Sequence, residues 1–202
     1  MTPRSSEEQL LLGEWACLGI LYQAPTHGFA IAARLKPDGD VGRVWSLSRA
    51  LTYRSLEQLT TRGFVHAVAQ EQGIAGGNRT VLAATRTGRA KLRRWLGSPV
   101  AHLRDVRSEL LLKLIIAELC SVDIDPMLRE QRSLIGEMAR AMSTATAPTV
   151  GSNTRAGTTV AGDRGRDNTT THDVVALWRL ESSQAALRFL DRLLGEEIVR
   201  AE

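Results

Sequence analysis

The sequence predicts a mainly helical protein with a small β-hairpin wing, and three observations lead to this prediction. Residues 46–62 carry apolar side chains at helical spacing, and Gly63 ends that pattern. Two stretches with strand-like patterns, starting at Phe64 and at Thr80, follow on either side of a glycine-rich tip at 73–79. Amphipathic helical patterns fill most of the remaining chain. Helix, strand, tip and strand in this order are typical of a winged helix-turn-helix.

The first two helices are predicted from a cap, a stripe and a turn. A capping box at residues 5–8, Ser-Ser-Glu-Glu, predicts that the first helix begins there. Its buried side should be one broad stripe of residues three or four apart: Leu11, Trp15, Leu18 and Tyr22. Residues 25–28, Pro-Thr-His-Gly, are typical of a turn, and a second helix should span 29–35 before the turn signal at 36–40.

Charge is distributed unevenly along the chain. Residues 43–94 hold ten Arg or Lys against two acids. Residues 1–99 carry 13 bases and 7 acids, a net +6, whereas residues 100–202 carry 13 bases and 15 acids, a net −2. Because a solvated surface usually mixes its signs, the basic half is expected to face a polyanion such as DNA, and the second half to have a different task.

The third helix separates into two faces when its residues are placed at 100° intervals. One face has the size for a core and carries Thr52, Leu56 and Leu59, with Tyr53 at its edge. The other has the chemistry for a DNA groove and carries Leu51, Arg54, Gln58 and Arg62. Leu51 is the exception there: it either contacts a thymine methyl group or packs on the preceding helix, and packing is the preferred interpretation.

The DNA contacts are expected from the third helix, the wing and the helix after it. A recognition helix enters the major groove by its N-terminal turns, so Arg49 or Arg54 is the candidate base reader, with a phosphate contact as the alternative for each. Arg79 on the wing tip should reach the minor groove or its phosphates, unless the tip is a bare hairpin. Thr85 can cap a fourth helix that runs to Leu96. The expected DNA-binding residues are Arg49, Thr52, Tyr53, Arg54, Gln58, Asn78, Arg79, Arg86 and Arg89.

The second half of the chain reads as a helical dimerisation domain, residues 100–202, after a DNA-binding domain at 1–99. A very apolar helix should follow Asp105, and a second subunit is expected to bury the side that carries Leu111, Leu114 and Ile115. Pro126 should begin another helix, whose seam is Leu128, Gln131, Ile135, Met138 and Met142. Residues 144–171 hold almost no large apolar side chain, so we expect a disordered insert. A last helix should span about 173–199, with Leu187 and Leu190 in its dimerisation seam.

Several classes of protein are disfavoured by the sequence. His27 has no second ligand at metal spacing, so a turn or cap role is preferred, and no metal site, cofactor or catalytic constellation is expected. Cys17 and Cys120 lie on apolar faces and should be small buried hydrophobes rather than redox sensors. Neither a membrane span nor a signal peptide is predicted, which favours a cytoplasmic protein. Because no catalytic constellation is found, an enzyme is not expected.

Four stretches in the correct order together resemble the PadR family of transcriptional regulators. Residues 18–31 contain Leu-Gly-Ile-Leu and then Pro-Thr-His-Gly-Phe-Ala-Ile, with Phe29 where the family has tyrosine. Residues 51–65 resemble its recognition helix, where Tyr53 matches the family's tyrosine, although Arg49-Ala50 replaces a frequent Pro-Gly or Pro-Ser. Asn-Arg at 78–79 with Thr-Arg-Thr-Gly-Arg at 85–89 resembles the wing and the element after it. Residues 107–114 are similar to the start of the C-terminal domain in the longer, virulence-activator-like members.

The resemblance implies a homodimeric, sequence-specific regulator that binds double-stranded DNA at an inverted-repeat operator. Many members are repressors released by a small, often aromatic molecule, and here such an effector is expected near Trp15, Met138, Met142 and Trp178. Trp178 alone reads either as a platform for a planar ligand or, preferably, as a core or dimer residue. The rival hypothesis is a winged-helix module that binds a protein and not DNA. The operator sequence, the target genes and the choice between repression and activation stay open.

Overall fold

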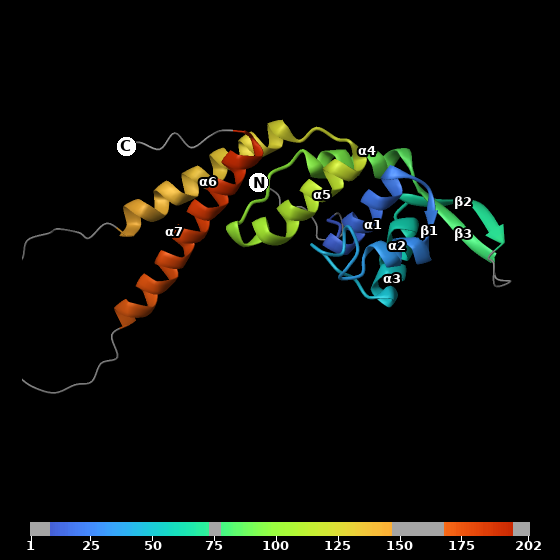
Figure 1. Ribbon diagram of the computed structural model, residues 1–202, viewed down its shortest axis with the longest axis horizontal. Coiled ribbons are helices and arrows are strands. Elements are labelled where there is room, and N and C mark those ends of the chain that lie inside the picture. Colours follow the sequence, from blue (N-terminus) through green and yellow to red (C-terminus); the bar gives the residue numbers. More distant parts are fainter. Residues whose placement is uncertain (1–8, 73–77, 147–167, 196–202) are drawn as a thin grey trace, which may run out of the picture. The chain divides into compact units, whose positions relative to one another are not determined.

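The computed structural model describes residues 9–72, 78–146 and 168–195, and the chain divides into two compact units, 1–127 and 128–202. The first unit combines helices with a small β-sheet, and the second consists of two long helices (Figure 1). The predicted fold class is therefore confirmed. The expected cap at 5–8 and most of the wing tip lie outside the described residues. No helix in the described part of the chain has the length and apolar character that crossing a membrane requires.

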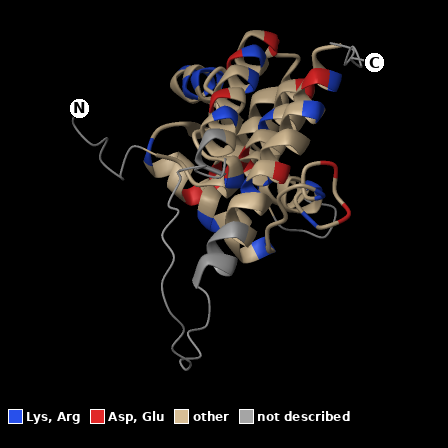
Figure 2. Ribbon diagram, turned by 90° about the vertical axis from the view of Figure 1, so that its left-hand side faces the viewer, with Lys and Arg blue, Asp and Glu red and all other residues tan. Residues whose placement is uncertain are grey.

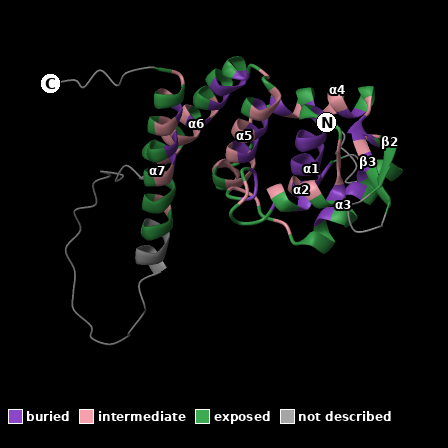
Figure 3. Cartoon of the chain, turned by 45° about the vertical axis from the view of Figure 1, so that its right-hand side comes forward, coloured by how far each residue is buried: buried purple, intermediate pink, exposed green. Residues whose placement is uncertain are grey.

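Helix α1 (Leu12–Gln23) is the centre of the first unit. It is buried from Gly13 to Tyr22, as the purple colour in Figure 3 shows, because it contacts helices and sheet on several sides. The predicted single stripe is therefore wrong, and Leu11, expected within it, is 72% exposed. The helix also begins later than predicted. The carboxylate of Glu14 accepts a hydrogen bond from the Leu11 amide at 2.8 Å, and this closes the first turn at Leu12 rather than within residues 5–8.

The contact between α1 and α5 (Leu111–Cys120) depends on a glycine. A Cβ atom on Gly19 would lie 2.7 Å from Cγ2 of Ile116, so the missing side chain lets the two helices approach closely. Cys17 is fully buried nearby, and burial raises the pKa of its thiol to about 12. Cys120 donates to the Gly19 carbonyl at 3.4 Å, and burial raises the pKa of that thiol to about 11. Both raised pKa values favour the protonated thiol near neutral pH. Cys17 is buried as expected, whereas Cys120 is only half-buried.

A short strand, a short helix and a loop precede the third helix. The strand is β1 (Thr26–His27), the helix is α2 (Gly28–Arg34), and α3 (Arg49–Thr61) follows the loop. The predicted turn at 25–28 thus contains a strand, which pairs with β3. In the loop, Arg34 Nε donates to both carboxylate oxygens of Asp40 at 3.1 Å, and this hydrogen bonding lowers the pKa of Asp40. The Leu47 amide donates to the Leu35 carbonyl at 2.9 Å, so the loop fixes where α3 begins.

The sheet is antiparallel, with strand order β1-β3-β2 in the described residues. Gly63 adopts the left-handed conformation (φ 71°) that ends α3 and turns the chain into β2 (Val65–Gln72). Strand β3 (Asn78–Ala84) returns beside it, with a bulge in β2 between Ala67 and Ala69. Val65 is buried and the following β2 residues are exposed, so the hairpin extends beyond the helices as the predicted wing (Figure 1).

Helix α4 (Arg86–Leu96) follows the wing as predicted. The Thr85 hydroxyl caps it by accepting from the Gly88 amide at 3.0 Å. The continuous helix expected from Asp105 is instead divided into a 3₁₀ turn, η1 (Leu103–Asp105), a π-helical turn, η2 (Val106–Leu110), and α5. The irregular turns place different residues of this stretch against the core than a single α-helix would.

A buried cluster ties α4 and α5 to α1. Trp15 and Trp95 stack with ring centroids 4.6 Å apart and planes 8° apart. Trp95 Nε1 donates to a Glu109 oxygen at 2.9 Å, and Lys113 Nζ lies 3.1 Å from the same oxygen and 5.0 Å from the Trp95 ring centroid. The Lys113 side chain is 1% exposed and also donates to the Ser98 carbonyl, while burial lowers its pKa. Lys113 is thus a core residue, not merely the charge that interrupts an apolar run.

Helix α5 belongs to the first unit, although the sequence analysis placed it in the C-terminal domain. Its buried side, made of Leu112, Lys113, Ile116 and Ala117, packs toward α1. Its other apolar side chains, Leu111, Leu114 and Ile115, are half-buried. Burial of this second side by a partner subunit stays a prediction.

The second unit is formed by α6 (Asp125–Thr146) and α7 (Asn168–Leu193), which lie side by side (Figure 1) and are joined by an ion pair between Arg132 and Asp191. The α6 seam is buried at Leu128, Gln131 and Ile135 and half-buried at Met138 and Met142. Residues 144–146 and 168–171, expected in the disordered insert, are helical, and 147–167 lie outside the described residues. Helix α7 therefore begins before residue 173, and it ends at Leu193 rather than near 199.

Helix α7 leaves apolar side chains exposed between Val174 and Trp178. Leu187 is half-buried, and Leu190 is fully buried within its own chain, so the dimerisation role predicted for Leu190 is wrong. Val174, Val175, Leu177 and Trp178 are 45–71% exposed. Much of the helix is correspondingly green in Figure 3.

Candidate nucleic-acid interface

The two faces predicted for α3 are present in the structure. Thr52, Leu56 and Leu59 are 0–4% exposed and pack in the core, whereas Arg54 and Gln58 are exposed. Ser48 caps the helix by accepting from the Leu51 amide at 3.3 Å. Leu51 is 49% exposed, so the preferred interpretation, that it packs on the preceding helix, is wrong.

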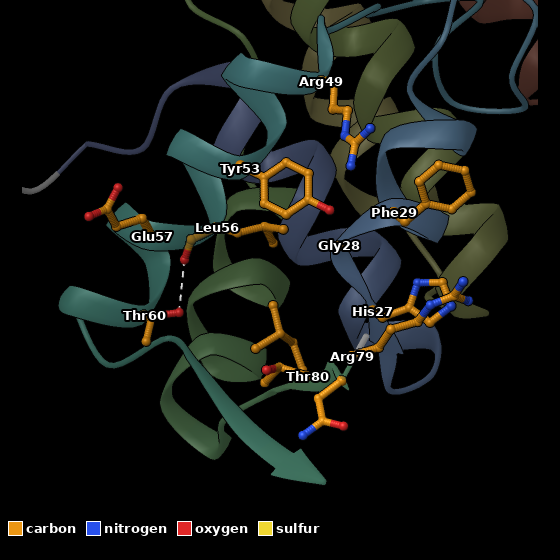
Figure 4. Close-up of a pocket in the computed structure, with 12 residues that line it drawn as sticks. His27, Gly28, Phe29, Arg49, Tyr53, Leu56, Glu57, Thr60, Arg79 and Thr80 are labelled. Carbon is orange, nitrogen blue, oxygen red and sulfur yellow. Dashed lines mark hydrogen bonds between the residues drawn. The ribbon is translucent and has the colours of Figure 1, made fainter. Parts of the chain in front are cut away.

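Arg49, on the first turn of α3, is held between two aromatic rings. Its guanidinium carbon lies 5.6 Å from the ring centroid of Phe29 and 5.7 Å from that of Tyr53 (Figure 4). Gly28 makes this arrangement possible, because a Cβ atom there would lie 2.9 Å from Tyr53 Cε1. Both rings are also half-exposed, with exposed fractions of 55% and 44%. The result is a cation fixed at the surface by its neighbours, which the periodicity of the sequence did not indicate.

A groove runs between α3 and the wing, and Arg49 lies at its edge. It has a volume of about 580 Å³. Figure 4 shows side chains entering it from the start of α2, from one flank of α3 and from β3. Its lining residues are His27, Gly28, Phe29, Arg49, Tyr53, Leu56, Glu57, Thr60, Asn78, Arg79, Thr80 and Leu82. The groove thus brings Arg49 and Tyr53 of the predicted site together with Asn78 and Arg79.

His27 is an N-cap, as the sequence favoured. Its Nδ1 accepts a hydrogen bond from the Ala30 amide at 3.1 Å at the start of α2. Because Nδ1 acts as the acceptor, the ring proton of the neutral imidazole lies on Nε2, which is then a donor. His27 is also one of the residues that line the groove, a position that the sequence did not predict.

Two residues expected to contact DNA have other partners. Thr52 is fully buried, and its hydroxyl donates to the Ser48 carbonyl at 3.0 Å, so it does not lie on the exposed face of α3. Arg89 donates to the Tyr22 carbonyl at 3.0 Å, and its guanidinium carbon lies 4.7 Å from the Tyr22 ring centroid. By contrast, Arg86 is exposed at the start of α4.

Other bases of the first unit also pack on aromatic rings. Lys91 lies 5.2 Å and Arg62 5.8 Å from the ring centroid of Phe64, and Arg93 donates to the Tyr22 hydroxyl at 2.7 Å. These contacts position three of the basic side chains where α3, the wing and α4 meet. In the view of Figure 2 the helices carry blue and red segments together, and residues 100–202 hold 13 bases against 15 acids. The basic excess is therefore a feature of the winged helix.

The residues named for an effector lie in different units. Trp15 is 5% exposed and enclosed by its stack with Trp95 in the first unit. In the second unit Trp178 is 71% exposed on α7, and Met138 and Met142 are half-buried on α6.

Comparison with known proteins agrees with this geometry. Residues 17–94, which span α1 to α4, match the family model described as the transcriptional regulator PadR-like family. No match was found among curated proteins. Similar solved structures include Bacillus subtilis PadR in complex with operator DNA, with 18% identity over 90% of this chain and 96% of that chain and a TM-score of 0.41. Another is smu.1604c from Streptococcus mutans UA159, with 17% identity over 92% of this chain and 99% of that chain and a TM-score of 0.40.

A third is Bacillus subtilis PadR in complex with p-coumaric acid, with 18% identity over 95% of this chain and 97% of that chain and a TM-score of 0.36. The matched residues 17–94 coincide with the winged helix and its groove. The winged helix of this chain is thus similar to the PadR-like family of transcriptional regulators.

Proposed function

We propose that the protein is a homodimeric regulator whose winged helix binds an inverted-repeat DNA operator. The observation that carries the proposal is the groove between α3 and the wing, where Arg49 and Arg79 line the same hollow. In this arrangement the exposed face of α3 enters the major groove and the wing reaches the neighbouring minor groove. The phosphodiester backbone between the two DNA grooves then follows the protein groove, where Arg49, Arg79, the Tyr53 hydroxyl and His27 Nε2 supply donors.

The two candidate base readers receive different tasks in this proposal. Arg49 is fixed beside the groove by Phe29 and Tyr53, which suits a contact to phosphate. Arg54 is exposed on the face opposite the core residues of α3, which suits a bidentate contact to guanine O6 and N7. Base reading is therefore proposed for Arg54, with Gln58 one turn further along the same face.

Dimerisation is proposed through apolar surfaces of both units. On α5 these are Leu111, Leu114 and Ile115, and on α7 they are the half-buried seam residue Leu187 and the exposed Val174 and Leu177. The other predicted seam residue, Leu190, is fully buried within its own chain and is therefore left out of this surface. Contiguous exposed apolar side chains are typical of an interface. Two symmetry-related copies of α3 would then read half-sites about 34 Å apart, one helical turn of DNA.

Regulation is proposed to follow the pattern of a repressor released by a small planar effector. Trp178, which is 71% exposed on α7, is the proposed platform for such a ligand, and Met138 and Met142 supply adaptable apolar surface on α6. Release by tenfold requires about 1.4 kcal/mol of coupling between effector and operator. Tryptophan quenching by planar aromatic acids in wild type and Trp178→Phe tests this part, and quenching that is equal in both variants together with constant DNA affinity would refute it.

The central experiment measures DNA affinity against salt. Fluorescence anisotropy with a labelled random-sequence duplex should show affinity that falls by orders of magnitude between about 50 and 200 mM salt, because bound phosphates release counterions. Arg49→Ala should reduce the slope of log affinity against log salt concentration by about one, the change expected when one phosphate contact is lost. Arg104→Ala is the matched control, since Arg104 is an 81% exposed base on η1, away from α3 and the wing.

The rival function, a winged helix that binds a protein, predicts a different result. Apolar protein contacts respond little to salt, and Arg49→Ala would then act no differently from Arg104→Ala. DNA affinity that is weak and independent of salt would therefore favour the rival and remove the proposed function.

A further inference from the structure

We infer that Leu51 reads a thymine methyl group in the operator, an inference that rests on the DNA binding proposed above. Leu51 lies on the first turn of α3, where its amide donates to the Ser48 hydroxyl at 3.3 Å. Its side chain is 49% exposed. The leading turn of a recognition helix is the part that meets base edges. An apolar side chain is therefore placed where base edges would be contacted.

The position of Leu51 on the helix excludes a role in the core. At 100° per residue, Leu51 lies about 20° from Gln58 and about 60° from Arg54, both of them exposed. The core face of the same helix carries Leu56 and Leu59, which are 4% and 0% exposed. Leu51 thus belongs to the face that is proposed to enter the major groove.

The neighbouring exposed aromatic residues contact Arg49, on a different flank of α3 from Leu51. Phe29 and Tyr53 hold the Arg49 guanidinium between their rings, beside the groove and the wing. Leu51 lies about 160° around the helix from Tyr53, on the flank away from that groove. Its exposure is therefore separate from the proposed phosphate contact.

The chemistry of the major groove leaves one suitable contact for such a side chain. Among the groups that base pairs present there, the C5-methyl group of thymine is the apolar one, and apolar side chains recognise it by contact. Arg54 follows Leu51 after about 4.5 Å of helix rise, a distance between one and two base-pair steps of about 3.4 Å each. The operator half-site should therefore contain a thymine near the guanine that Arg54 reads.

The test removes one methyl group from the DNA and one side chain from the protein. A random duplex library is first selected with the full-length wild-type protein. The most enriched duplex is then synthesised with each thymidine replaced in turn by deoxyuridine, which keeps the hydrogen-bonding edge and lacks only the methyl group. Affinities are measured for wild type, Leu51→Ala, Leu51→Met and the matched control Leu11→Ala, which shortens a leucine that is 72% exposed outside α3.

The inference predicts that wild type loses about fourfold in affinity at one deoxyuridine position of a half-site, the equivalent of one methyl group buried. Leu51→Ala should bind the thymidine and deoxyuridine duplexes equally, and Leu51→Met and Leu11→Ala should keep the difference. The inference is overturned if wild type ignores every deoxyuridine, if the enriched half-site lacks thymine, or if Leu51→Ala keeps the wild-type difference. If no sequence is enriched and binding ignores salt, the proposed function itself fails, and this inference with it.

Discussion

Replacing Gly19 by alanine is expected to destabilise the first unit, although alanine is the better helix former. The new Cβ atom would lie 2.7 Å from Cγ2 and 3.0 Å from Cγ1 and Cδ1 of Ile116, whereas carbon atoms prefer about 3.5–4.0 Å. Ile116 is fully buried, so its side chain has little room to move away. Overpacking of this kind costs about 1–3 kcal/mol, and the gain in helix propensity offsets about 1 kcal/mol of it. The expected net loss in the free energy of unfolding is therefore as much as ~2 kcal/mol.

The sign of the effect should reverse when Ile116 is shortened. Ile116→Ala removes all three atoms that the new Cβ would meet, so Gly19→Ala should then stabilise the protein by about 1 kcal/mol, the propensity term alone. A double-mutant cycle by urea unfolding, followed by circular dichroism, measures both steps. The control is Gly136→Ala within α6, where the new Cβ has its nearest neighbour at 3.9 Å and a modest gain is expected. An equal effect of Gly19→Ala in both backgrounds would refute the close contact of α1 and α5.

Three further predictions concern a thiol, the recognition helix and the dimer. Above pH 9 the free energy of unfolding should fall, because the unfolded chain releases the Cys17 proton at its ordinary pKa of 9.0, whereas burial raises the pKa in the folded state to about 12. At about pH 10.5 the loss is ~2 kcal/mol, and Cys17→Ala should remove this part of the pH dependence in urea unfolding. Arg54→Ala should weaken binding to the selected duplex by ~1–3 kcal/mol and to random DNA much less, while the buried Thr52, replaced by valine, should leave both affinities unchanged in anisotropy titrations. Equal losses on both duplexes would make Arg54 a phosphate contact. Leu177→Ser should weaken self-association in analytical ultracentrifugation, because Leu177 is 56% exposed on the proposed interface, and unchanged sedimentation would place the interface elsewhere.

The fold could be predicted from the sequence because its elements depend on local signals. Thr85 and Leu96 bound α4 as expected, since a cap and the end of an apolar period are both visible in a single segment. The core and exposed faces of α3 follow from periodicity in the same way. The start of α1 was missed because residues 5–8 and Glu14 offer two capping signals only one or two turns apart, and in the structure Glu14 accepts from the Leu11 amide just before the helix begins.

The candidate site was only partly predictable, because its geometry comes from residues distant in sequence. The sandwich of Arg49 between Phe29 and Tyr53 depends on the approach of α2 to α3, which no spacing in the sequence encodes. The contacts of Arg89 with Tyr22 likewise engage a base that composition alone would count as fully available, and leave it half-buried. Composition therefore predicted the kind of partner, whereas packing decides which bases can meet it.

In the described part of the chain, one edge of the wing has no neighbouring strand. Strand β2 lies at the end of the order β1-β3-β2, so its outer edge presents backbone N–H and C=O groups that another strand can pair with. The bulge between Ala67 and Ala69 interrupts the regular ladder of donors and acceptors along this edge, and Gln70 and Glu71 follow it as polar residues. Both features oppose edge-to-edge aggregation of two wings. The residues of β2 are thus constrained in two ways: by what the wing binds, and by the need to keep its outer edge from pairing with another strand.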